Sequence, residues 1–170
     1  MPDQLALDFG EATASRSAVI SSDGLYRYRL DRRWGYGARV VWIMLNPSTA
    51  DAEQDDASIR RITGFSRGWG FSALTVVNLY GWRATDPTDL WSAADPVGPD
   101  NDRHIAEVCA TSHVIAAWGA NARPDRISAV LALPAMDGLK ALAVTKTGQP
   151  RHPLYLRGDL TPQPWRCPDV

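Results

Sequence analysis

Four clusters of polar residues follow stretches of apolar residues, and their side chains are of kinds that bind small polar ligands. The clusters are residues 46–51 (Asn-Pro-Ser-Thr-Ala-Asp), Asn78 followed by Tyr80, Trp82 and Arg83, residues 118–121 (Trp-Gly-Ala-Asn), and residues 146–153 (Lys-Thr-Gly-Gln-Pro-Arg-His-Pro). Amide side chains both donate and accept hydrogen bonds, and a histidine can hold or release a proton near neutral pH. These clusters therefore hold candidate groups for recognising a polar ligand and polarising a bond in it.

The apolar stretches before these clusters predict the strands of a buried sheet. They are residues 39–45, 73–79, 113–118 and 140–144. Nearly continuous apolar runs of this length are typical of strands that are covered on both faces, as in a parallel sheet.

Helical patterns separate these strands. Their predicted starts are Asp55 or Asp56, Asp86 with Pro87, Asp100 or Asn101, and Pro124. Strand and helix alternate over residues 39–144, which predicts an α/β fold with right-handed crossovers. We expect three layers, α/β/α, around a central, mostly parallel, four-stranded sheet.

The N-terminal part is expected to add an edge strand or a hairpin to this sheet. Residues 25–30 alternate arginines with apolar and aromatic residues, and we expect them to form an edge strand paired with residues 39–45. Residues 1–20 have no sustained period, so we expect a flexible arm there. The remaining residues, 21–170, are predicted to form a single α/β domain.

The four clusters are predicted to converge on one crevice, because open α/β sheets bind ligands beyond the carboxyl ends of their strands. Asn46 and His152 are the first two candidate site residues. The candidate ligand-binding residues are Pro47, Ser48, Thr49, Asp51, Asp56, Arg60, Asn78, Tyr80, Trp118, Gly119, Lys146 and Arg151. Tyr80 or Trp82 is the candidate stacking face for a planar ligand.

Several of these residues also have a structural explanation. Asn46 with Pro47 is compatible with a turn that ends a strand, and Asn78 with an amide that satisfies loop backbone groups. The acidic residues of segment 51–56 are explained more simply by helix capping and loop solvation than by a metal. We therefore expect no metal and no cofactor.

The overall composition limits the classes of function. The chain has 170 residues, 45% of them apolar, and a net charge of −1, so it has no global basic field for nonspecific binding of nucleic acid. Phosphate contacts would depend on local basic groups, namely Arg27, Arg29, Arg32, Arg33, Arg151 and Arg157. The sequence contains neither an export signal nor a long apolar segment, and two cysteines fit a reducing compartment, so we expect a cytoplasmic protein without a membrane anchor.

From Tyr26 to Tyr155 the chain closely resembles an uncharacterised prokaryotic and phage family, domain of unknown function 1643. The resemblance rests on the segments 44–51 (Met-Leu-Asn-Pro-Ser-Thr-Ala-Asp), Asp56 with Arg60 and Arg61, 77–79, 85–87, 117–119 and 146–155 (Lys-Thr-Gly-Gln-Pro-Arg-His-Pro-Leu-Tyr). The family brings no assigned activity with it.

The order of residues at the strand ends also resembles, more distantly, the uracil-DNA glycosylase superfamily. The matching positions are Asn46-Pro47, Asn78, Trp118-Gly119 and His152-Pro153. This resemblance implies that Asn46 and His152 are the catalytic residues: Asn46 orients an attacking water, and His152 stabilises negative charge on the departing base. It also implies that Asn78 binds the edge of the base. The implied partners are a nucleobase, a nucleotide, or a base in single-stranded or extruded nucleic acid.

Three hypotheses about function follow. The first is a nucleobase- or nucleotide-binding crevice that hydrolyses an N-glycosidic bond. The second is a non-catalytic nucleic-acid-binding or accessory module with the same crevice. The third is a hydrolase or transferase for another small molecule, in which His152 acts with Asp51 or Asp56.

Overall fold

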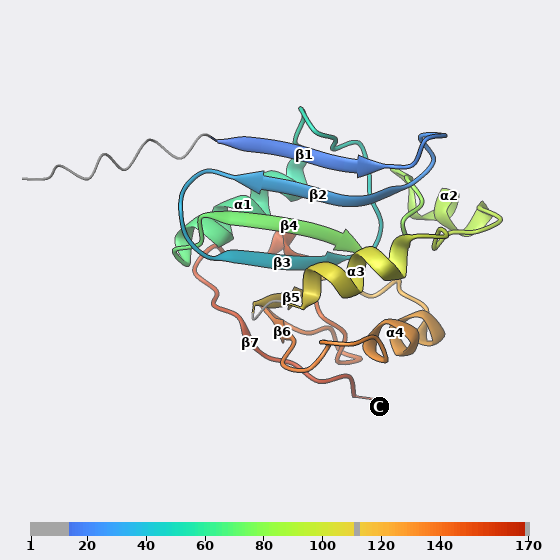
Figure 1. Cartoon of the computed structure of the whole chain (residues 1–170). Helices are drawn as coiled ribbons and strands as arrows, with labels where there is room; N and C mark the ends of the chain where they lie inside the picture. The colour runs from blue at the N-terminus through green and yellow to red at the C-terminus, as the bar shows by residue number, and fades with distance from the viewer. Residues whose placement is uncertain (1–13, 111–112, 169–170) are drawn as a thin grey trace, which may run out of the picture.

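The structure is a computed structural model that describes residues 14–110 and 113–168. Its strands are β1 (Ser15–Ile20), β2 (Arg27–Arg33), β3 (Arg39–Met44), β4 (Ala73–Asn78), β5 (Val114–Ala116), β6 (Lys140–Ala141) and β7 (Gln163–Pro164). Its helices are α1 (Ala57–Gly68), α2 (Pro87–Ser92), α3 (Asn101–Cys109), α4 (Pro124–Leu131) and the short 3-10 helix η1 (Pro153–Tyr155). Figure 1 shows their arrangement.

The described strands form one mixed seven-stranded sheet in the order β1-β2-β4-β3-β5-β6-β7. Strand β3 pairs in parallel with β4 and β5, and β5 pairs in parallel with β6. The pairs β1–β2, β2–β4 and β6–β7 are antiparallel. The chain is therefore an α/β protein, and its sheet is wider than the predicted one because a hairpin extends it beyond β4 and β7 extends it beyond β6.

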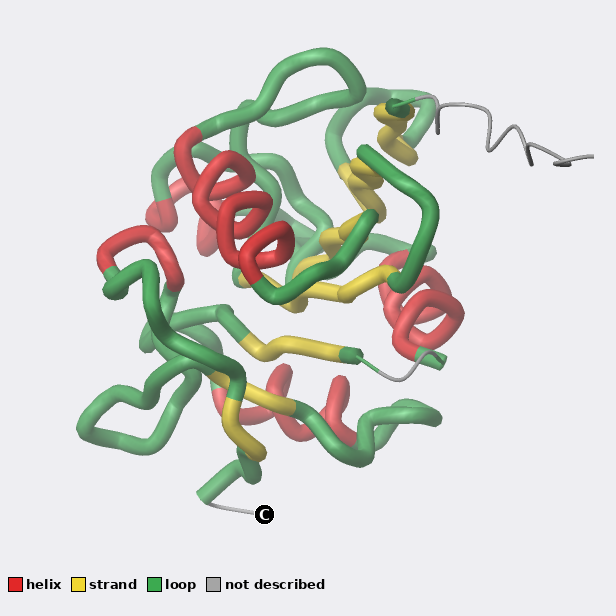
Figure 2. Tube along the Cα trace, turned by 90° about the vertical axis from the view of Figure 1, so that its left-hand side faces the viewer, coloured by secondary structure: helices red, strands yellow, loops and turns green. Residues whose placement is uncertain are grey.

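Helices lie on both faces of this sheet (Figure 2). Alternate residues of a strand point to opposite faces, so β3 divides its side chains between two apolar cores. Val41 and Ile43 pack in the core that includes residues of α3 and α4. Val40 and Trp42 pack in the core that includes residues of α1.

The N-terminal hairpin differs from the sequence-based expectation in two ways. Strand β2 pairs with β4, with Leu30 opposite Val76, and does not pair with residues 39–45. Both edges of β3 are already occupied by β4 and β5, which is why β2 lies elsewhere. Residues 15–20, expected in the flexible arm, form β1 and cover the outer edge of β2. Residues 1–13 of the predicted arm lie outside the described residues.

Helices α1 and α2 start where an aspartate side chain accepts a hydrogen bond from a backbone N–H of the first turn. Asp56 is the N-cap of α1, and its Oδ1 accepts a hydrogen bond of 2.8 Å from the backbone N–H of Ile59. Asp86 caps α2 in the same way through Thr88. The Asp100 side chain makes no such bond at the start of α3. Within the described ranges no helix is suited to crossing a bilayer, and the longest, α1, has 12 residues.

We predict that Asp56→Ala destabilises the fold by about 1 kcal/mol, because α1 loses its N-cap acceptor. Asp56→Asn should leave stability close to that of the wild type, since asparagine caps helices as well as aspartate does. Urea denaturation of the three proteins measures both effects. Equal losses in the two variants would mean that the charge of Asp56, and not its capping oxygen, supports the start of α1.

Candidate functional site

A cavity of about 560 Å³ lies beyond the carboxyl ends of β3, β4 and β5. We refer to it as the main cavity. Its volume lies in the range of sites for small molecules. The residues that line it are Arg27, Met44, Leu45, Asn46, Ser48, Asp56, Ala57, Ser58, Ile59, Asn78, Ala84, Thr85, Trp118, Gly119, Ala120, Asn121, His152, Leu154 and Tyr155.

The strand order explains why a cavity forms at this point. Strand β3 lies between β4 and β5, so the connection through α1 leads to one side of β3 and the later connection through α3 leads to the other. The chain diverges at the carboxyl end of β3, which is the usual position of a ligand crevice in open α/β sheets.

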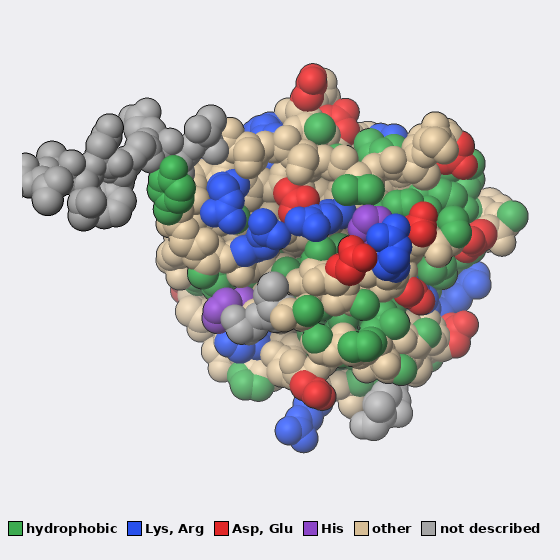
Figure 3. Space-filling model, in the orientation of Figure 1, with side chains coloured by type: hydrophobic (Ala, Val, Ile, Leu, Met, Phe, Trp, Pro, Cys, Tyr) green, Lys and Arg blue, Asp and Glu red, His purple; other side chains and the backbone are tan. Residues whose placement is uncertain are grey.

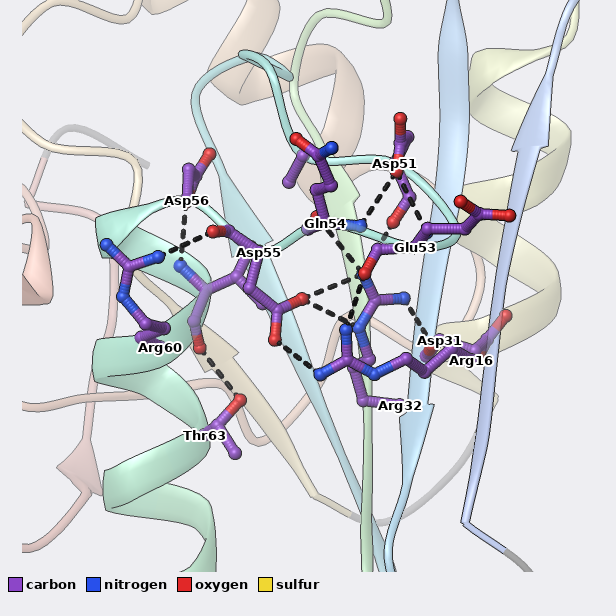
Figure 4. A network of polar contacts seen from close by, with 12 residues as sticks. Arg16, Asp31, Arg32, Asp51, Glu53, Gln54, Asp55, Asp56, Arg60 and Thr63 are labelled. Carbon is purple, nitrogen blue, oxygen red and sulfur yellow. Dashed lines mark hydrogen bonds and ion pairs between the residues drawn. The ribbon is translucent and has the colours of Figure 1, made fainter.

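Two arginines of the N-terminal hairpin hold the loop between β3 and α1 in place (Figure 4). Arg32 of β2 is only 4% exposed and forms an ion pair of 2.8 Å with Asp55. It also donates hydrogen bonds to the carbonyls of Asp51 and Gln54. Arg16 of β1 reaches the second oxygen of Asp55 at 3.1 Å. The loop that begins at Asn46 and ends at Asp56 is thereby anchored to the N-terminal hairpin.

Asn46 follows β3, and the backbone fixes the orientation of its amide. Its Nδ2 donates to the carbonyl oxygens of Pro47 and Ala84, at 3.0 and 2.8 Å. Because carbonyls only accept, the nitrogen must occupy this position. In the described part of the chain Oδ1 accepts no hydrogen bond, so Asn46 contributes a free acceptor to the main cavity.

Asn78 is the last residue of β4 and is 2% exposed. Its backbone oxygen accepts a hydrogen bond of 2.9 Å from Asn101. Its side-chain amide has no hydrogen-bond partner among the described residues and lines the main cavity. This amide can therefore donate to and accept from one edge of a planar ligand.

His152 caps the short helix η1, and that contact determines its tautomer. Nδ1 accepts a hydrogen bond of 3.2 Å from the backbone N–H of Leu154, so the proton of the neutral ring is on Nε2. Burial lowers the pKa of His152, and the negative charge of Asp56 opposes this shift without reversing it. His152 thus offers one N–H donor while it remains uncharged.

Trp118 and Gly119 follow β5 and connect to the His152 loop. Trp118 is 1% exposed, and its Nε1 donates to the side chain of Gln149 at 3.1 Å. Gly119 has a φ of +78°, a conformation that favours glycine. Its N–H donates to the carbonyl of Pro150 at 2.8 Å, two residues before His152. The third and fourth polar clusters are therefore bound to each other.

Several residues that line the main cavity were not among the candidates for the site, and Arg27 and Tyr155 are two of them. Arg27 of β2 is 2% exposed, and burial lowers its pKa to about 10, so it stays protonated at neutral pH. Tyr155 lies at the rim, where it is 86% exposed. The sequence named Arg27 only as one of several basic groups, because nothing in its strand distinguishes a buried arginine from a solvent-facing one.

Some of the candidate residues do not line the main cavity. They are Pro47, Thr49, Asp51, Arg60, Tyr80, Lys146 and Arg151. Asp51 Oδ1 accepts from the backbone N–H groups of Glu53 and Gln54, and these bonds lower its pKa. Tyr80 packs edge to face on Trp91, with ring centroids 5.2 Å apart. Of the others, Pro47 is a buried residue of the loop between β3 and α1, and the rest, namely Thr49, Arg60, Lys146 and Arg151, are exposed.

The predicted stacking face also lies elsewhere. Trp82 lines a second, smaller hollow of about 330 Å³, which shares Ser48, Ala84 and Thr85 with the main cavity. The aromatic rings that line the main cavity itself are those of Trp118 and Tyr155.

The described residues contain no group of three or more His, Cys, Asp or Glu side chains that is arranged to hold a metal ion.

Basic and acidic side chains are interspersed on the face that carries α3 (Figure 3). On that helix Arg103 pairs with Asp100 and Glu107, at 3.4 and 3.2 Å. This face offers a mixed surface rather than a basic one to a polyanion.

The lowered pKa of His152 predicts a pH dependence of stability. Above its ordinary pKa of about 6.5 the side chain is neutral in both the folded and the unfolded chain, and it contributes nothing. As the pH falls below that value, the unfolded chain takes up the proton first, so the free energy of unfolding decreases. We expect His152→Gln to lose less stability than the wild type between about pH 7 and pH 5.

Urea denaturation across this pH range measures the difference. Burial also lowers the pKa of His104 on α3, but both proteins contain His104, so its contribution cancels in the comparison. A nitrogen-detected titration of the ring should also show protonated Nε2 in the neutral form. A slope unchanged by His152→Gln, together with a proton on Nδ1, would contradict the geometry described above.

Comparison with known proteins identifies a family to which no activity has been assigned. No curated protein and no solved structure matches the chain. The family model described as "Protein of unknown function (DUF1643)" matches residues 27–154. This span contains every residue that lines the main cavity except Tyr155. The chain belongs to this family.

Proposed function

We propose that the main cavity binds a nucleobase or nucleotide and that its polar groups hydrolyse an N-glycosidic bond. The observation that carries this proposal is that Asn46, Asn78 and His152 line one cavity, each with a polar group that no described residue satisfies. The volume of about 560 Å³ is suited to a nucleoside-sized ligand. The resemblance of the strand-end motifs to the uracil-DNA glycosylase superfamily supports the same reaction and a related arrangement of layers.

The leaving group determines the role of His152. When the bond between the sugar C1′ and the base nitrogen breaks, the electron pair goes to the base, and negative charge appears on it. The Nε2–H of a neutral histidine can donate a hydrogen bond to that charge without first losing a proton. The free amide of Asn78 binds the edge of the base and orients it toward this donor.

Asn46 and Asp56 act on the water. The free Oδ1 of Asn46 accepts a hydrogen bond from the water and directs its oxygen toward C1′, but an amide does not take up the proton. Asp56 lines the same cavity, and Oδ1 of its carboxylate is committed to the cap of α1. Its Oδ2 accepts the proton as the bond from oxygen to C1′ forms, and the proton then neutralises the released base.

Release of free base is the direct test of this proposal. The substrates are single strands that contain uracil, hypoxanthine or an alkylated base, and the corresponding free nucleotides. His152→Ala should slow release about 100-fold while leaving the affinity for the uncleaved substrate nearly unchanged, because the charge it stabilises appears only during the reaction. His113→Gln is the control, since His113 lies at the amino end of β5 and the main cavity lies at its carboxyl end.

If the wild type releases no base from any of these substrates, the cavity does not act as a glycosylase. Weaker binding of the same ligands by His152→Ala would then favour a recognition module without catalysis.

A second candidate is hydrolysis of a different small ligand by His152 and Asp56. The observation in its favour is that both residues line the main cavity and that the charge of Asp56 acts on the pKa of His152. Asp51 does not line the cavity, so the pair formed by Asp51 and His152 is the weaker form of this hypothesis.

A further inference from the structure

We infer that Arg27 forms a subsite for the terminal phosphate of a free nucleotide at the base of the main cavity. The inference rests on the proposed function and adds the class of substrate. It predicts that a nucleoside monophosphate, with its charge on the sugar, is preferred over an uncharged nucleoside or a polynucleotide.

The first argument is that the protein leaves the charge of Arg27 unpaired. Nη1 donates to the carbonyl of Ala50 at 2.5 Å. Nε is enclosed and has no partner, and within residues 14–110 and 113–168 no acceptor receives a hydrogen bond from Nη2. A guanidinium that is 2% exposed is costly to bury without an anion. Arg27 lines the main cavity, so a ligand can supply the missing acceptors.

The second argument is a comparison with the other buried arginines. Arg32 lies on the same strand, is 4% exposed, and has the carboxylate of Asp55 at 2.8 Å. Arg126 of α4 is 7% exposed and pairs with Asp102 at 2.5 Å. Arg27 forms no ion pair in the part of the chain that the structure describes. Where this fold buries an arginine for structural reasons it provides a carboxylate, and at the main cavity it does not.

The surroundings of Arg27 indicate how strongly an anion would be held. Burial lowers the pKa of Arg27, and the nearby charges of Arg83 and Arg32 lower it further. The carboxylates of Asp56 and Asp51 raise it, and Asp56 has the larger effect of the two. Asp56 also lines the cavity, so a bound phosphate would experience both its repulsion and the attraction of Arg27. Removal of the Asp56 charge should therefore strengthen phosphate binding.

The position of Arg27 favours a terminal phosphate over the backbone of a polymer. The guanidinium is almost completely enclosed, whereas Tyr155 at the rim is 86% exposed. A terminal phosphate can end against a closed surface, but a phosphodiester must continue on both sides of its phosphorus. The base would then lie nearer Asn78 and His152, and the charged end nearer Arg27.

Calorimetric binding tests this inference with matched ligands. The probes are uridine and inosine, their 5′-monophosphates, inorganic phosphate, and a pentanucleotide without terminal phosphates. We expect each monophosphate to bind the wild type about 10- to 100-fold more tightly than its nucleoside, as is typical of hydrogen bonds between charged groups. Arg27→Gln should reduce this ratio to about one, and Arg27→Lys should restore part of it.

Two further variants test the direction in which the phosphate affinity changes and its dependence on the position of the charge. Asp56→Asn keeps the helix cap and should raise the affinity for the monophosphates several-fold, with little change for the nucleosides. Arg103→Gln removes the same charge as Arg27→Gln from an exposed position on α3 and should leave the ratio unchanged. If nucleosides bind and the phosphate adds nothing, the subsite is refuted and the proposed function stands.

Other outcomes separate the two proposals. Arg27-dependent binding of inorganic phosphate, without binding of any nucleoside or nucleotide, would support the anion subsite and refute the proposed function. A pentanucleotide that binds as tightly as the monophosphates, with the same dependence on Arg27, would overturn the assignment to a terminal phosphate. No Arg27-dependent gain with any phosphate would overturn the inference altogether.

A ligand-free measurement keeps the inference testable if Arg27→Gln folds poorly. Because the protein leaves Arg27 unpaired, Arg27→Met should lose much less stability in urea than Arg32→Met, which leaves the carboxylate of Asp55 without its buried partner. Equal destabilisation by the two substitutions would mean that Arg27 has a structural role and would contradict the inference.

Discussion

The main cavity depends on the buried guanidinium of Arg32. A buried charge is costly unless it is paired and hydrogen-bonded, and this guanidinium is 4% exposed. The loop between β3 and α1 gives it the carboxylate of Asp55 and two carbonyls, and the hairpin adds the carbonyls of Ser17 and Asp31. The loop has little secondary structure of its own, so this attachment to β2 replaces the packing that a helix or strand would provide. Its two ends carry Asn46 and Asp56, which are therefore held in fixed positions at the cavity.

Strand register brings the remaining groups to the same level. Met44 lies opposite Asn78, and Ile43 lies opposite Ala116, so the residues that follow β3 and β5 meet Asn78 at one edge of the sheet. The His152 segment cannot reach this edge through β6, which has only two residues. Hydrogen bonds from Arg151 N to Ala143 and from Gly119 N to Pro150, at 2.9 and 2.8 Å, carry it there instead. Backbone hydrogen bonds between loops therefore place the His152 segment at the same edge of the sheet as the other groups.

The residues at the strand ends could be predicted from the sequence because apolar runs locate buried strands and parallel strands end at a common edge. Asn46, Asn78, Trp118 and His152 follow this rule, and all four line the main cavity. Strand β1 could not be predicted in this way, since four of its six residues are exposed and it lacks the apolar run of a buried strand. It is held by pairing with β2 and by the ion pair of Arg16 with Asp55. Tertiary contacts, and not local pattern, stabilise it.

The burial of Arg27 was hidden from the sequence for a related reason. Strand β2 carries arginines at positions 27, 29, 32 and 33, and their residue type alone predicts exposure. Arg29 does lie partly exposed and pairs with Asp31 on its own strand. Arg27 and Arg32 are buried because the loop between β3 and α1 passes over them, and this loop gives a carboxylate to Arg32 only. The difference between two arginines five positions apart therefore depends on where a distant loop places one side chain.

The electrostatics of the main cavity fit a reaction in which charge develops late. Burial lowers the pKa of His152 by more than the charge of Asp56 raises it. The side chain nearest the proposed leaving base is therefore a neutral imidazole and not a cation. A neutral donor binds an uncharged base only moderately but stabilises it strongly once negative charge appears, and that difference is what accelerates a reaction. The full positive charge of the cavity belongs to Arg27, which comes from β2 and not from the strand ends. If the two proposals hold, affinity for a charged ligand comes from β2 and stabilisation of the departing base from the His152 loop, so His152 can stay neutral while Arg27 stays charged.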